Sequence, residues 1–308
     1  PAENFQLGRI YRLTTLLLRM LPVEHEYKTM GLAPYYNGPQ KNEVKKIFEE
    51  MQVVDGIDFK FNKKIKNIYD HLEENVEQFR FDHIAAGLQA FTEDLLVDWI
   101  SNSLNEFSGN SVVFSGGISM NIKANHKISQ ISNISKFFVS GGGADLSLAI
   151  GACYNEIENT QGTPLPLNNM YLGPPIIYNE SNFENLPQKY KIYEFKNTDE
   201  ILQRIFDGKI IATCLDRAEF GPRALGNRSL LANPAVHNIK NKLNKIKGRE
   251  DFRPFAAMIL KEDVLKYFSG GVASPYMNST YHASTYTEKK FPGIVHADGT
   301  TRLQIVDD

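Results

Sequence analysis

Apolar residues recur three and four positions apart in two stretches of the first hundred residues. The apolar positions are Ile10, Leu13, Leu17, Leu18 and Leu21 in residues 5–21, and Ile84, Leu88, Phe91, Leu95 and Trp99 in residues 82–104. This spacing places them on one face of a helix. Pro22 ends the first stretch, and Asp82 precedes the second as a candidate N-cap. Both stretches are predicted to be amphipathic helices.

Between them, residues 26–35 (EYKTMGLAPY) show no amphipathic period. Gly31 and Pro34 interrupt the segment, and both residues are typical of turns. We therefore expect a surface loop, with Lys28 near its centre.

Two short apolar runs each end in a glycine-rich turn. Residues 112–114 lead into SGGISMN (115–121), and residues 136–139 lead into SGGGAD (140–145). Each pattern predicts a strand, a turn and then a helix. A glycine has no β-carbon, so backbone amides of such a turn can approach phosphate oxygens. One such turn alone is more often plain strand–helix geometry, but two of them within 30 residues are as typical of a nucleotide cradle. Asp145 either holds a divalent cation there or caps the following helix.

Residues 159–175 are predicted to be a linker. Four prolines lie there among glycine, asparagine and threonine, without apolar periodicity. We place the boundary between two domains inside it, giving domains 1–165 and 166–308. In the second domain, residues 198–206 are predicted to form a helix, residues 209–215 a buried strand and residues 238–246 a basic helix.

Composition sets limits on the class of protein. With 308 residues, 42% hydrophobic and 23% charged, the chain has the balance of a soluble globular protein with two cores. The formal net charge of -2 gives no general attraction to nucleic acid or membrane. The longest apolar stretch, residues 16–21, is far shorter than the roughly 20 residues that span a bilayer. Cys153 and Cys214 lie in apolar runs and are predicted to be buried reduced thiols, which favours a cytoplasmic location.

The charge is unevenly placed. Residues 217–253 contain nine Lys or Arg against three acids, a net +6 that leaves -8 for the rest of the chain. Glycine and proline interrupt the segment EFGPRALGNRS (219–229), from which Arg223 and Arg228 project. Guanidinium groups bind phosphate or carbamoyl oxygens in forked pairs, whereas a solvated basic face is usually rich in lysine and helical. This region is predicted to bind anions.

Two further features are less informative. Residues 295–304 are predicted to form a turn that carries Asp298, Thr300 and Arg302. These residue types alone do not indicate a particular function. The seven histidines show no pairing at metal-ligand spacing, so none is a predicted ligand.

These segments together resemble the O-carbamoyltransferases of antibiotic and nodulation-factor biosynthesis. The matching segments, in family order, are residues 26–35, 82–89, 115–121, 145–151 (DLSLAIG), 219–229, 249–256 (REDFRPFA) and 298–304. The segment 219–229 is the most specific. The resemblance covers the middle of the family's sequence; the family's first phosphate loop, metal-binding histidines and Asn-rich C-terminal segment are expected to lie outside it.

The resemblance implies a mixed α/β and α+β fold. An actin- and sugar-kinase-like (ASKHA) lobe of the Kae1-like type, residues 1–165, would precede a YrdC-like α/β domain, residues 166–308. In the family, the YrdC-like domain joins carbamoyl phosphate to ATP to give carbamoyl-adenylate, and the Kae1-like domain passes the carbamoyl group to a hydroxyl of a small-molecule acceptor. Mg²⁺ would accompany ATP, and Fe²⁺ or another divalent metal would occupy the complete Kae1-like site.

The resemblance also assigns residues by position. The implied ligands of carbamoyl phosphate and ATP phosphates are Arg217, Arg223, Arg228, Lys247, Arg249, Arg253 and Arg302, of which Arg223, Arg228, Arg253 and Arg302 are the catalytic candidates. The implied nucleotide-binding residues are Lys28, Gly116, Gly117, Asn121, Gly142 and Gly143. Asp145 is the implied metal ligand, although one carboxylate cannot close a metal site.

Three other functions are compatible with parts of the sequence. A module that binds ATP or carbamoyl phosphate without turnover would use the same residues. A small-molecule kinase of the ASKHA superfamily would explain the glycine turns but not the arginine-rich half. A tRNA-modifying enzyme that makes threonylcarbamoyl-adenosine shares both domain types, but the absence of a broad basic surface argues against a nucleic-acid partner. Small molecules are the expected partners.

Overall fold

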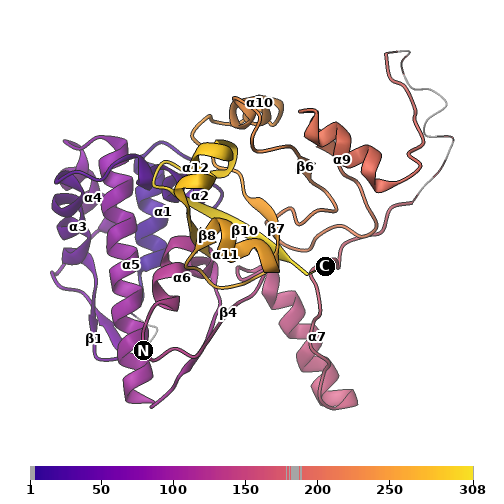
Figure 1. Ribbon diagram of the computed structural model, residues 1–308. Coiled ribbons are helices and arrows are strands. Elements are labelled where there is room, and N and C mark those ends of the chain that lie inside the picture. Colours follow the sequence, from indigo (N-terminus) through magenta and orange to yellow (C-terminus); the bar gives the residue numbers. More distant parts are fainter. Residues whose placement is uncertain (1–3, 178, 180, 182–186, 188, 308) are drawn as a thin grey trace.

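The computed structural model of the chain describes residues 4–177, 179, 181, 187 and 189–307 (Figure 1). The N-terminal half contains α1 (Leu7–Leu17), α2 (Glu26–Leu32), the 3-10 helix η2 (Ala33–Tyr35), α3 (Gln40–Met51), β1 (Val53–Asp55), β2 (Asp58–Lys60), α4 (Ile68–Val76) and α5 (Phe81–Glu106). It continues with β3 (Ser111–Phe114), η3 (Gly117–Met120), α6 (Ile122–Ser129), β4 (Lys136–Val139) and α7 (Leu146–Gln161). The predicted helices at 5–21 and 82–104 are confirmed as α1 and α5.

The long helix α5 organises the larger core. Its buried face includes Leu88, Phe91 and Leu96, and Phe91 stacks on Phe48 of α3 with ring centroids 5.7 Å apart. The predicted N-cap at Asp82 is wrong, because the helix already begins at Phe81. Asp82 instead lies in the first turn, where its buried carboxylate accepts hydrogen bonds from Arg80 at 2.9 and 3.1 Å. An acidic residue in this turn still complements the helix dipole.

The expectation of a loop at residues 26–35 is wrong, since α2 and η2 occupy that segment. Thr29 of α2 is fully buried, with its hydroxyl 3.0 Å from that of Thr15 in α1. On another side of α2, a Cβ added to Gly31 would meet the Phe252 ring at 3.6 Å. Two helical turns are too short for an apolar period to be recognised, and tertiary contacts on more than one side stabilise this helix.

Both predicted strand–turn–helix units are confirmed. β3 and β4 pair in parallel, with Val113 opposite Phe138, and α6 and α7 follow their turns. The two turns also contact each other, since the N–H of Gly116 donates to the carbonyl of Gly143 at 2.7 Å. Gly116 has a φ of 95°, which glycine adopts without strain.

The helix α7 projects from the rest of the chain (Figure 1), and none of its residues is buried. Leu148 is 72% exposed. Cys153 on α7 and Cys214 are both unpaired and exposed, so the prediction of buried thiols is wrong. The apolar runs around them misled the prediction, because neither run packs into a core of the described residues.

The C-terminal half is built around a four-stranded sheet. Its elements are α9 (Thr198–Phe206), β5 (Ile211–Ala212), β6 (Leu230–Leu231), α10 (Ile239–Ile246), β7 (Ala257–Leu260), η4 (Lys261–Asp263), α11 (Val264–Tyr267), β8 (Phe268–Ser269), β9 (Thr280–Ala283), α12 (Thr285–Lys290), η5 (Pro292–Ile294) and β10 (Thr300–Val306). The sheet order is β7-β10-β9-β8, with β10 parallel to β7 and antiparallel to β9. The predicted helices at 198–206 and 238–246 are confirmed.

The predicted buried strand at 209–215 is largely wrong. Only β5 is a strand, and Leu215 is 55% exposed. Beyond β5 the backbone follows the segment 219–229 instead, since Thr213 donates to the carbonyl of Ser229 at 2.8 Å and Leu215 to that of Asn227 at 2.9 Å. The apolar run at residues 209–215 therefore lies alongside the loop 219–229 and does not form part of a core.

The architecture is a mixed arrangement of helices and small sheets, as predicted. The two named domain types and the boundary at 165/166 stay predictions. Part of the predicted linker is fixed, because Met170 is buried and its carbonyl accepts the N–H of Phe220 at 2.7 Å. Across the described residues, the helices are all too short or too polar to cross a membrane.

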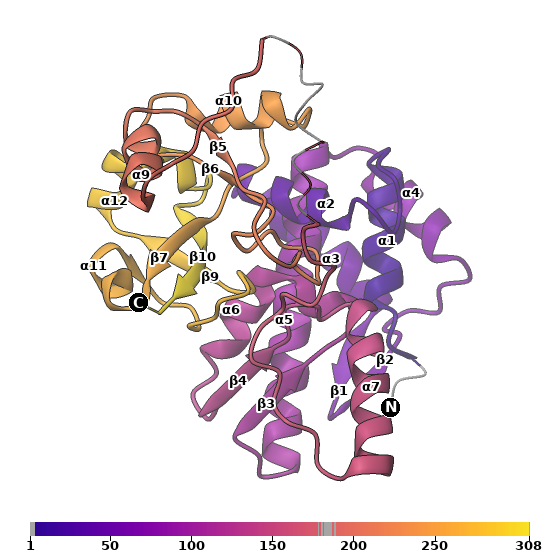
Figure 2. The same ribbon diagram turned by 90° about the vertical axis from the view of Figure 1, so that its right-hand side faces the viewer.

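The two halves meet along a seam formed by α2, η2 and α6 on one side and by β9, β10 and residues 249–255 on the other (Figure 2). Tyr35 donates its hydroxyl to the carbonyl of Phe252 at 3.1 Å. Asn125 of α6 donates its amide to the carbonyl of Asn278 at 2.8 Å. The pocket described below lies in this seam.

Gly87 provides a test of the α3–α5 packing. A Cβ added there would lie 2.5 Å from Cγ1 of Val44 and 3.0 Å from the backbone nitrogen of Lys45. Helix propensity alone would make Gly87→Ala stabilising by about 1 kcal/mol. We expect overpacking to prevail, so that urea unfolding shows a loss of about 1–3 kcal/mol.

The matched control is Gly151→Ala on α7, where an added Cβ meets nothing within 4 Å. This variant should gain up to about 1 kcal/mol from helix propensity. Equal stabilisation by the two substitutions would contradict the close α3–α5 contact.

Candidate functional site

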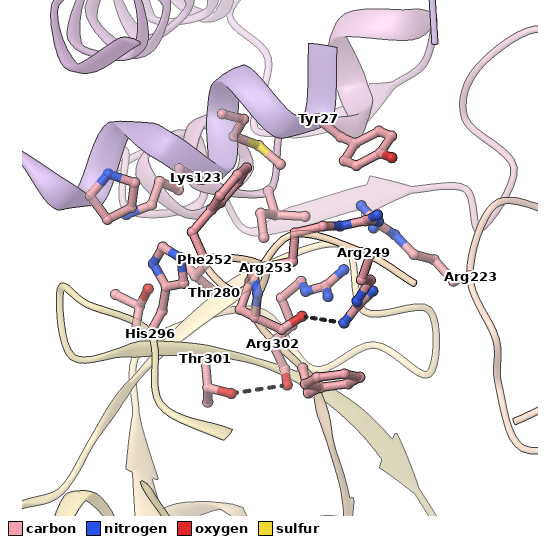
Figure 3. Close-up of a pocket in the computed structure, with 17 residues that line it drawn as sticks. Tyr27, Lys123, Arg223, Arg249, Phe252, Arg253, Thr280, His296, Thr301 and Arg302 are labelled. Atoms are coloured by element: carbon pink, nitrogen blue, oxygen red, sulfur yellow. Dashed lines mark hydrogen bonds between the residues drawn. The ribbon is translucent and has the colours of Figure 1, made fainter. Parts of the chain in front are cut away.

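A solvent-open pocket lies in the seam between the two halves (Figure 3). The N-terminal half contributes Tyr27, Met30 and Gly31 of α2, Pro34, and Ile122 and Lys123 at the start of α6. The C-terminal half contributes Arg223, residues 249 and 252–255, Thr280, His296, Thr300, Thr301 and Arg302. Residues from opposite ends of the sequence therefore share one cavity.

Four arginines, Arg223, Arg249, Arg253 and Arg302, gather at this pocket (Figure 3). Burial lowers the pKa of Arg223 to about 10. Burial and the charge of Arg253 lower the pKa of Arg249 to about 10. Burial and the charges of the other three hold the pKa of Arg302 well below its usual range. All three shifts report poorly solvated cations, and those of Arg249 and Arg302 also report repulsion by neighbouring guanidinium groups.

Carboxylates do little to neutralise this cluster. Among the described residues, only Glu250 lies at ion-pair distance from any of the four, 3.8 Å from Arg253. Arg249 donates to the amide oxygen of Asn244 at 2.6 Å and stacks over the ring of Phe255 at 4.2 Å, so its partners are neutral. A concentration of partly buried positive charge with a single acid near the limit of ion-pair distance is suited to an anionic ligand.

The loop 219–229 is held by the carboxylate of Glu219. This group accepts the backbone N–H groups of Leu225 at 2.7 Å, Asn227 at 2.9 Å and Arg228 at 3.1 Å. Gln304 of β10 donates to the carbonyl of Leu225 at 2.7 Å. The loop is thereby fixed to the strand that carries Arg302, which places Arg223 near it.

Gly221 lets the loop lie against the second glycine turn. Its φ is 146°, and an added Cβ would lie 3.1 Å from the carbonyl oxygen of Gly141. A side chain at this position would force the two segments apart.

Three of the seven predicted anion ligands do not line the pocket. Arg228 donates to the carbonyls of Leu215 and Asp216, which fastens the loop backbone. Arg217 is exposed and donates to the carbonyl of Leu172 at 3.1 Å, and Lys247 is also exposed. Ligand contacts by these three residues stay predictions, whereas Arg223, Arg249, Arg253 and Arg302 are brought together.

The predicted nucleotide-binding residues lie outside the lining of this pocket. Gly116 and Gly117 are exposed, and Gly142 and Gly143 are buried, at the carboxyl ends of β3 and β4. Lys28 is paired with Glu250 at 2.6 Å beside the pocket. Nucleotide binding by these residues stays a prediction.

Asn121 is committed to the fold. It is buried and exchanges two hydrogen bonds with Gln89, at 2.9 and 3.0 Å. Its oxygen also caps α6 by accepting the N–H of Ala124 at 3.1 Å. These contacts occupy its carbonyl oxygen, so a nucleotide contact from Asn121 stays a prediction without support from its surroundings.

Metal binding by Asp145 stays a prediction, because the described residues supply no further ligands beside it. Asp145 is exposed at the N-cap position of α7, but its side chain makes no capping hydrogen bond. No group of three or more His, Cys, Asp or Glu side chains within the described chain could hold a metal ion. We therefore assign no step to a metal.

Sequence reasoning missed the opposite end of the pocket, where His296, Asp298 and Lys123 meet. His296 is buried, and its Nδ1 lies 3.6 Å from Oδ1 of Asp298. Asp298 also forms an ion pair with Lys123 and accepts the Thr300 hydroxyl at 2.7 Å. Burial raises the pKa of Asp298, but the bonds from His296 and Thr300 and the charge of Lys123 outweigh it and hold that pKa well below its usual range.

Little in the sequence could have revealed this arrangement. His296 and Asp298 are neighbours on one turn, but Lys123 is separated from Asp298 by 175 positions. Tyr27 and Phe252 likewise reach the pocket from different halves. Contacts of this range have no local signature.

Comparison with known proteins places both halves in one family. Residues 3–154 match a model described as carbamoyltransferase N-terminus, and residues 202–308 match one described as carbamoyltransferase C-terminus. An uncharacterised protein of Methanocaldococcus jannaschii is 30% identical, over 97% of this chain and 59% of its own length. Nodulation protein NolO of Bradyrhizobium diazoefficiens is 29% identical, over 99% of this chain and 58% of its own. Nodulation protein NolNO of Sinorhizobium fredii is also 29% identical, over 99% and 47%.

The chain spans about half the length of the curated relatives that it matches.

The hydrogen bonds to Glu219 predict a pH-dependent stability. Burial raises the pKa of Glu219, but the backbone donors outweigh it and set that pKa below its usual value. A lowered folded-state pKa means that the stabilisation is complete above the unfolded pKa of about 4.3 and is lost as the pH falls through the folded value. Glu219→Gln should therefore cost about 1–3 kcal/mol at pH 7 and less at pH 3.

Urea unfolding of both proteins across this range measures the difference. A cost that stays constant from pH 7 to pH 3 would contradict a role for the ionised carboxylate.

Proposed function

Because both halves match models of one family, the chain belongs to the carbamoyltransferase family, and we propose that it activates carbamoyl phosphate with ATP in the arginine pocket. The carbamoyl group would then pass to a hydroxyl of a small-molecule acceptor. The observation that carries this proposal is the cluster of Arg223, Arg249, Arg253 and Arg302, which the described carboxylates leave largely unpaired.

Carbamoyl activation requires this kind of site. Carbamoyl phosphate and the triphosphate of ATP both carry several negative oxygens, and bringing them together costs Coulomb repulsion. Fixed guanidinium groups offset that repulsion and bind the oxygens in forked pairs. The four arginines line one pocket, so a single bound ligand can contact several of them.

The proposed reaction balances with one water. Water cleaves carbamoyl phosphate to carbamate and inorganic phosphate, and a carbamate oxygen then attacks the α-phosphorus of ATP and displaces pyrophosphate. The resulting carbamoyl-adenylate carries the carbamoyl group to the acceptor hydroxyl, which releases AMP. Mg²⁺ would accompany the nucleotide as a counter-ion.

The glycine turns support a nucleotide-linked transfer step. They lie at the carboxyl ends of the parallel strands β3 and β4, which is where ligands bind in open parallel sheets. The loop 219–229 reaches them, since Gly221 approaches the carbonyl of Gly141. Under this proposal, activation and transfer occur on neighbouring surfaces of the two halves.

The first test is pyrophosphate release from ATP. We expect the protein to release pyrophosphate and AMP only when carbamoyl phosphate is also present. Release of ADP instead would favour a small-molecule kinase, and binding of both ligands without any product would favour a binding module.

A second test separates ligand binding from fold stability. Arg302→Met removes a cation that its neighbours repel, so urea unfolding should show a gain of about 1 kcal/mol or more. Because the same cation is proposed to bind phosphate, calorimetry should show at least about a tenfold loss of pyrophosphate affinity, about 1.4 kcal/mol.

Arg228→Met is the matched control. Its guanidinium binds the carbonyls of Leu215 and Asp216, so its loss should cost about 1–3 kcal/mol of unfolding free energy. Pyrophosphate affinity should stay within about threefold, a change under 1 kcal/mol. An unchanged stability combined with a lost affinity would instead make Arg228 a ligand residue.

A further inference from the structure

We propose that His296 is the general base of the first half-reaction, the attack of water on the carbonyl carbon of carbamoyl phosphate. This inference rests on the proposed function and extends it to a residue outside the arginine cluster.

The side chain of His296 is buried yet has a free ring nitrogen. It is 9% exposed, and its Nε2 has no hydrogen-bond partner among the described residues. A buried polar atom without a partner is costly unless a ligand or water completes it. His296 also lines the pocket that contains the arginines (Figure 3). Under this proposal, a water bound at Nε2 lies at the wall of the cavity that holds the phosphate.

The turn that carries His296 fixes the ring. The backbone N–H of His296 donates to the carbonyl of Thr300 at 2.8 Å, and Gly299 donates to the carbonyl of His296 at 3.0 Å. The ring of Tyr35 packs edge-on against the imidazole, with centroids 5.5 Å apart. Backbone and ring contacts thus restrain the side chain before any ligand binds.

Asp298 lies beside the ring on its Nδ1 side. Its Oδ1 lies 3.6 Å from Nδ1 of His296, which favours the tautomer with hydrogen on Nδ1 and a lone pair on Nε2. Asp298 is itself held by Lys123, by the hydroxyl of Thr300 at 2.7 Å and by the backbone N–H of Thr300 at 3.2 Å. A carboxylate, an imidazole and a second ring nitrogen without a partner among the described residues are the groups that activate a nucleophile in hydrolases.

The proposed step conserves atoms and charge. The water oxygen bonds to the carbonyl carbon as Nε2 takes one of its protons, and the bond from that carbon to the phosphate oxygen then breaks. The departing phosphate receives this proton, and the second water proton leaves to solvent as carbamate forms. The arginines stabilise the phosphate, so acid–base work and anion binding fall to different residues of one pocket.

The groups that face the imidazole determine its behaviour. They are Asp298 on the same turn, which is itself paired with Lys123 from α6, and the ring of Tyr35 from η2. The cluster of arginines lines the remainder of the cavity. None of these groups is a better base than His296 for a water in the pocket. The lysine and the arginines are cations, and the carboxylate of Asp298 already binds Lys123 and Thr300.

The test separates the two half-reactions in His296→Asn. Release of inorganic phosphate from carbamoyl phosphate should fall by about 10²–10⁴-fold. Pyrophosphate release from ATP supplied with freshly dissolved ammonium carbamate, which bypasses the first half-reaction, should stay within about threefold of the parent protein. Binding of phosphonoacetamide, an analogue that water cannot cleave at this position, should also be retained because the arginines are intact.

His237→Asn is the matched control, since His237 is exposed and lies outside the pocket lining. It should leave both half-reactions unchanged. If His296→Asn proves unstable in urea unfolding, His296→Gln offers a second variant, because the side chain of glutamine is closer in length to that of histidine.

The outcomes distinguish the inference from the proposed function. Equal losses in both half-reactions, or unchanged phosphate release, would overturn the role of His296. A parent protein that makes no pyrophosphate even from ATP and carbamate would instead overturn the proposed function itself.

Discussion

The arrangement of the pocket depends on concentrated positive charge that the protein does not neutralise. Four guanidinium groups meet at a partly buried site, and the pKa of Arg302 is held well below its usual range by burial and by the other three. Such a cluster opposes folding, so it persists only where surrounding interactions determine each position. Glu219 fixes the loop of Arg223, Asn244 holds Arg249, and strand β10 carries Arg302.

The seam between the halves keeps that charge available. Two carboxylates lie at the two ends of the pocket, Glu250 and Asp298, and each is bound by a lysine from the N-terminal half. Lys28 of α2 lies 2.6 Å from Glu250, and Lys123 of α6 pairs with Asp298. Glu250 consequently lies no closer than 3.8 Å to Arg253. Contact between the two halves therefore also affects the charge of the pocket. Lysines of the N-terminal half bind the two carboxylates, and the guanidinium groups stay available for a ligand.

Local signals determined what the sequence could predict. The helices α1, α5, α9 and α10 and both strand–turn–helix units follow from periodicity and turn chemistry. The helix α2 has no such period, because it is two turns long and contacts neighbours on several sides. The apolar runs at Cys153 and Cys214 indicated burial, yet whether a run is buried depends on what packs against it. In the site, the arginine-rich segments were recognisable, whereas the approach of Lys123 to Asp298 across 175 positions was not.

The segment 219–229 shows why a specific motif does not translate residue by residue into ligand contacts. Glu219 binds three backbone N–H groups, Gly221 allows the approach to Gly141, and Leu225 is buried with its carbonyl bound by Gln304. Of its two arginines, Arg223 lines the pocket, while Arg228 is bound to two backbone carbonyls of the neighbouring segment. Most of the motif therefore serves to hold one guanidinium in place. A charged residue in such a motif can stabilise the fold or bind a ligand. Its hydrogen-bond partners in the structure show which of these two roles it has.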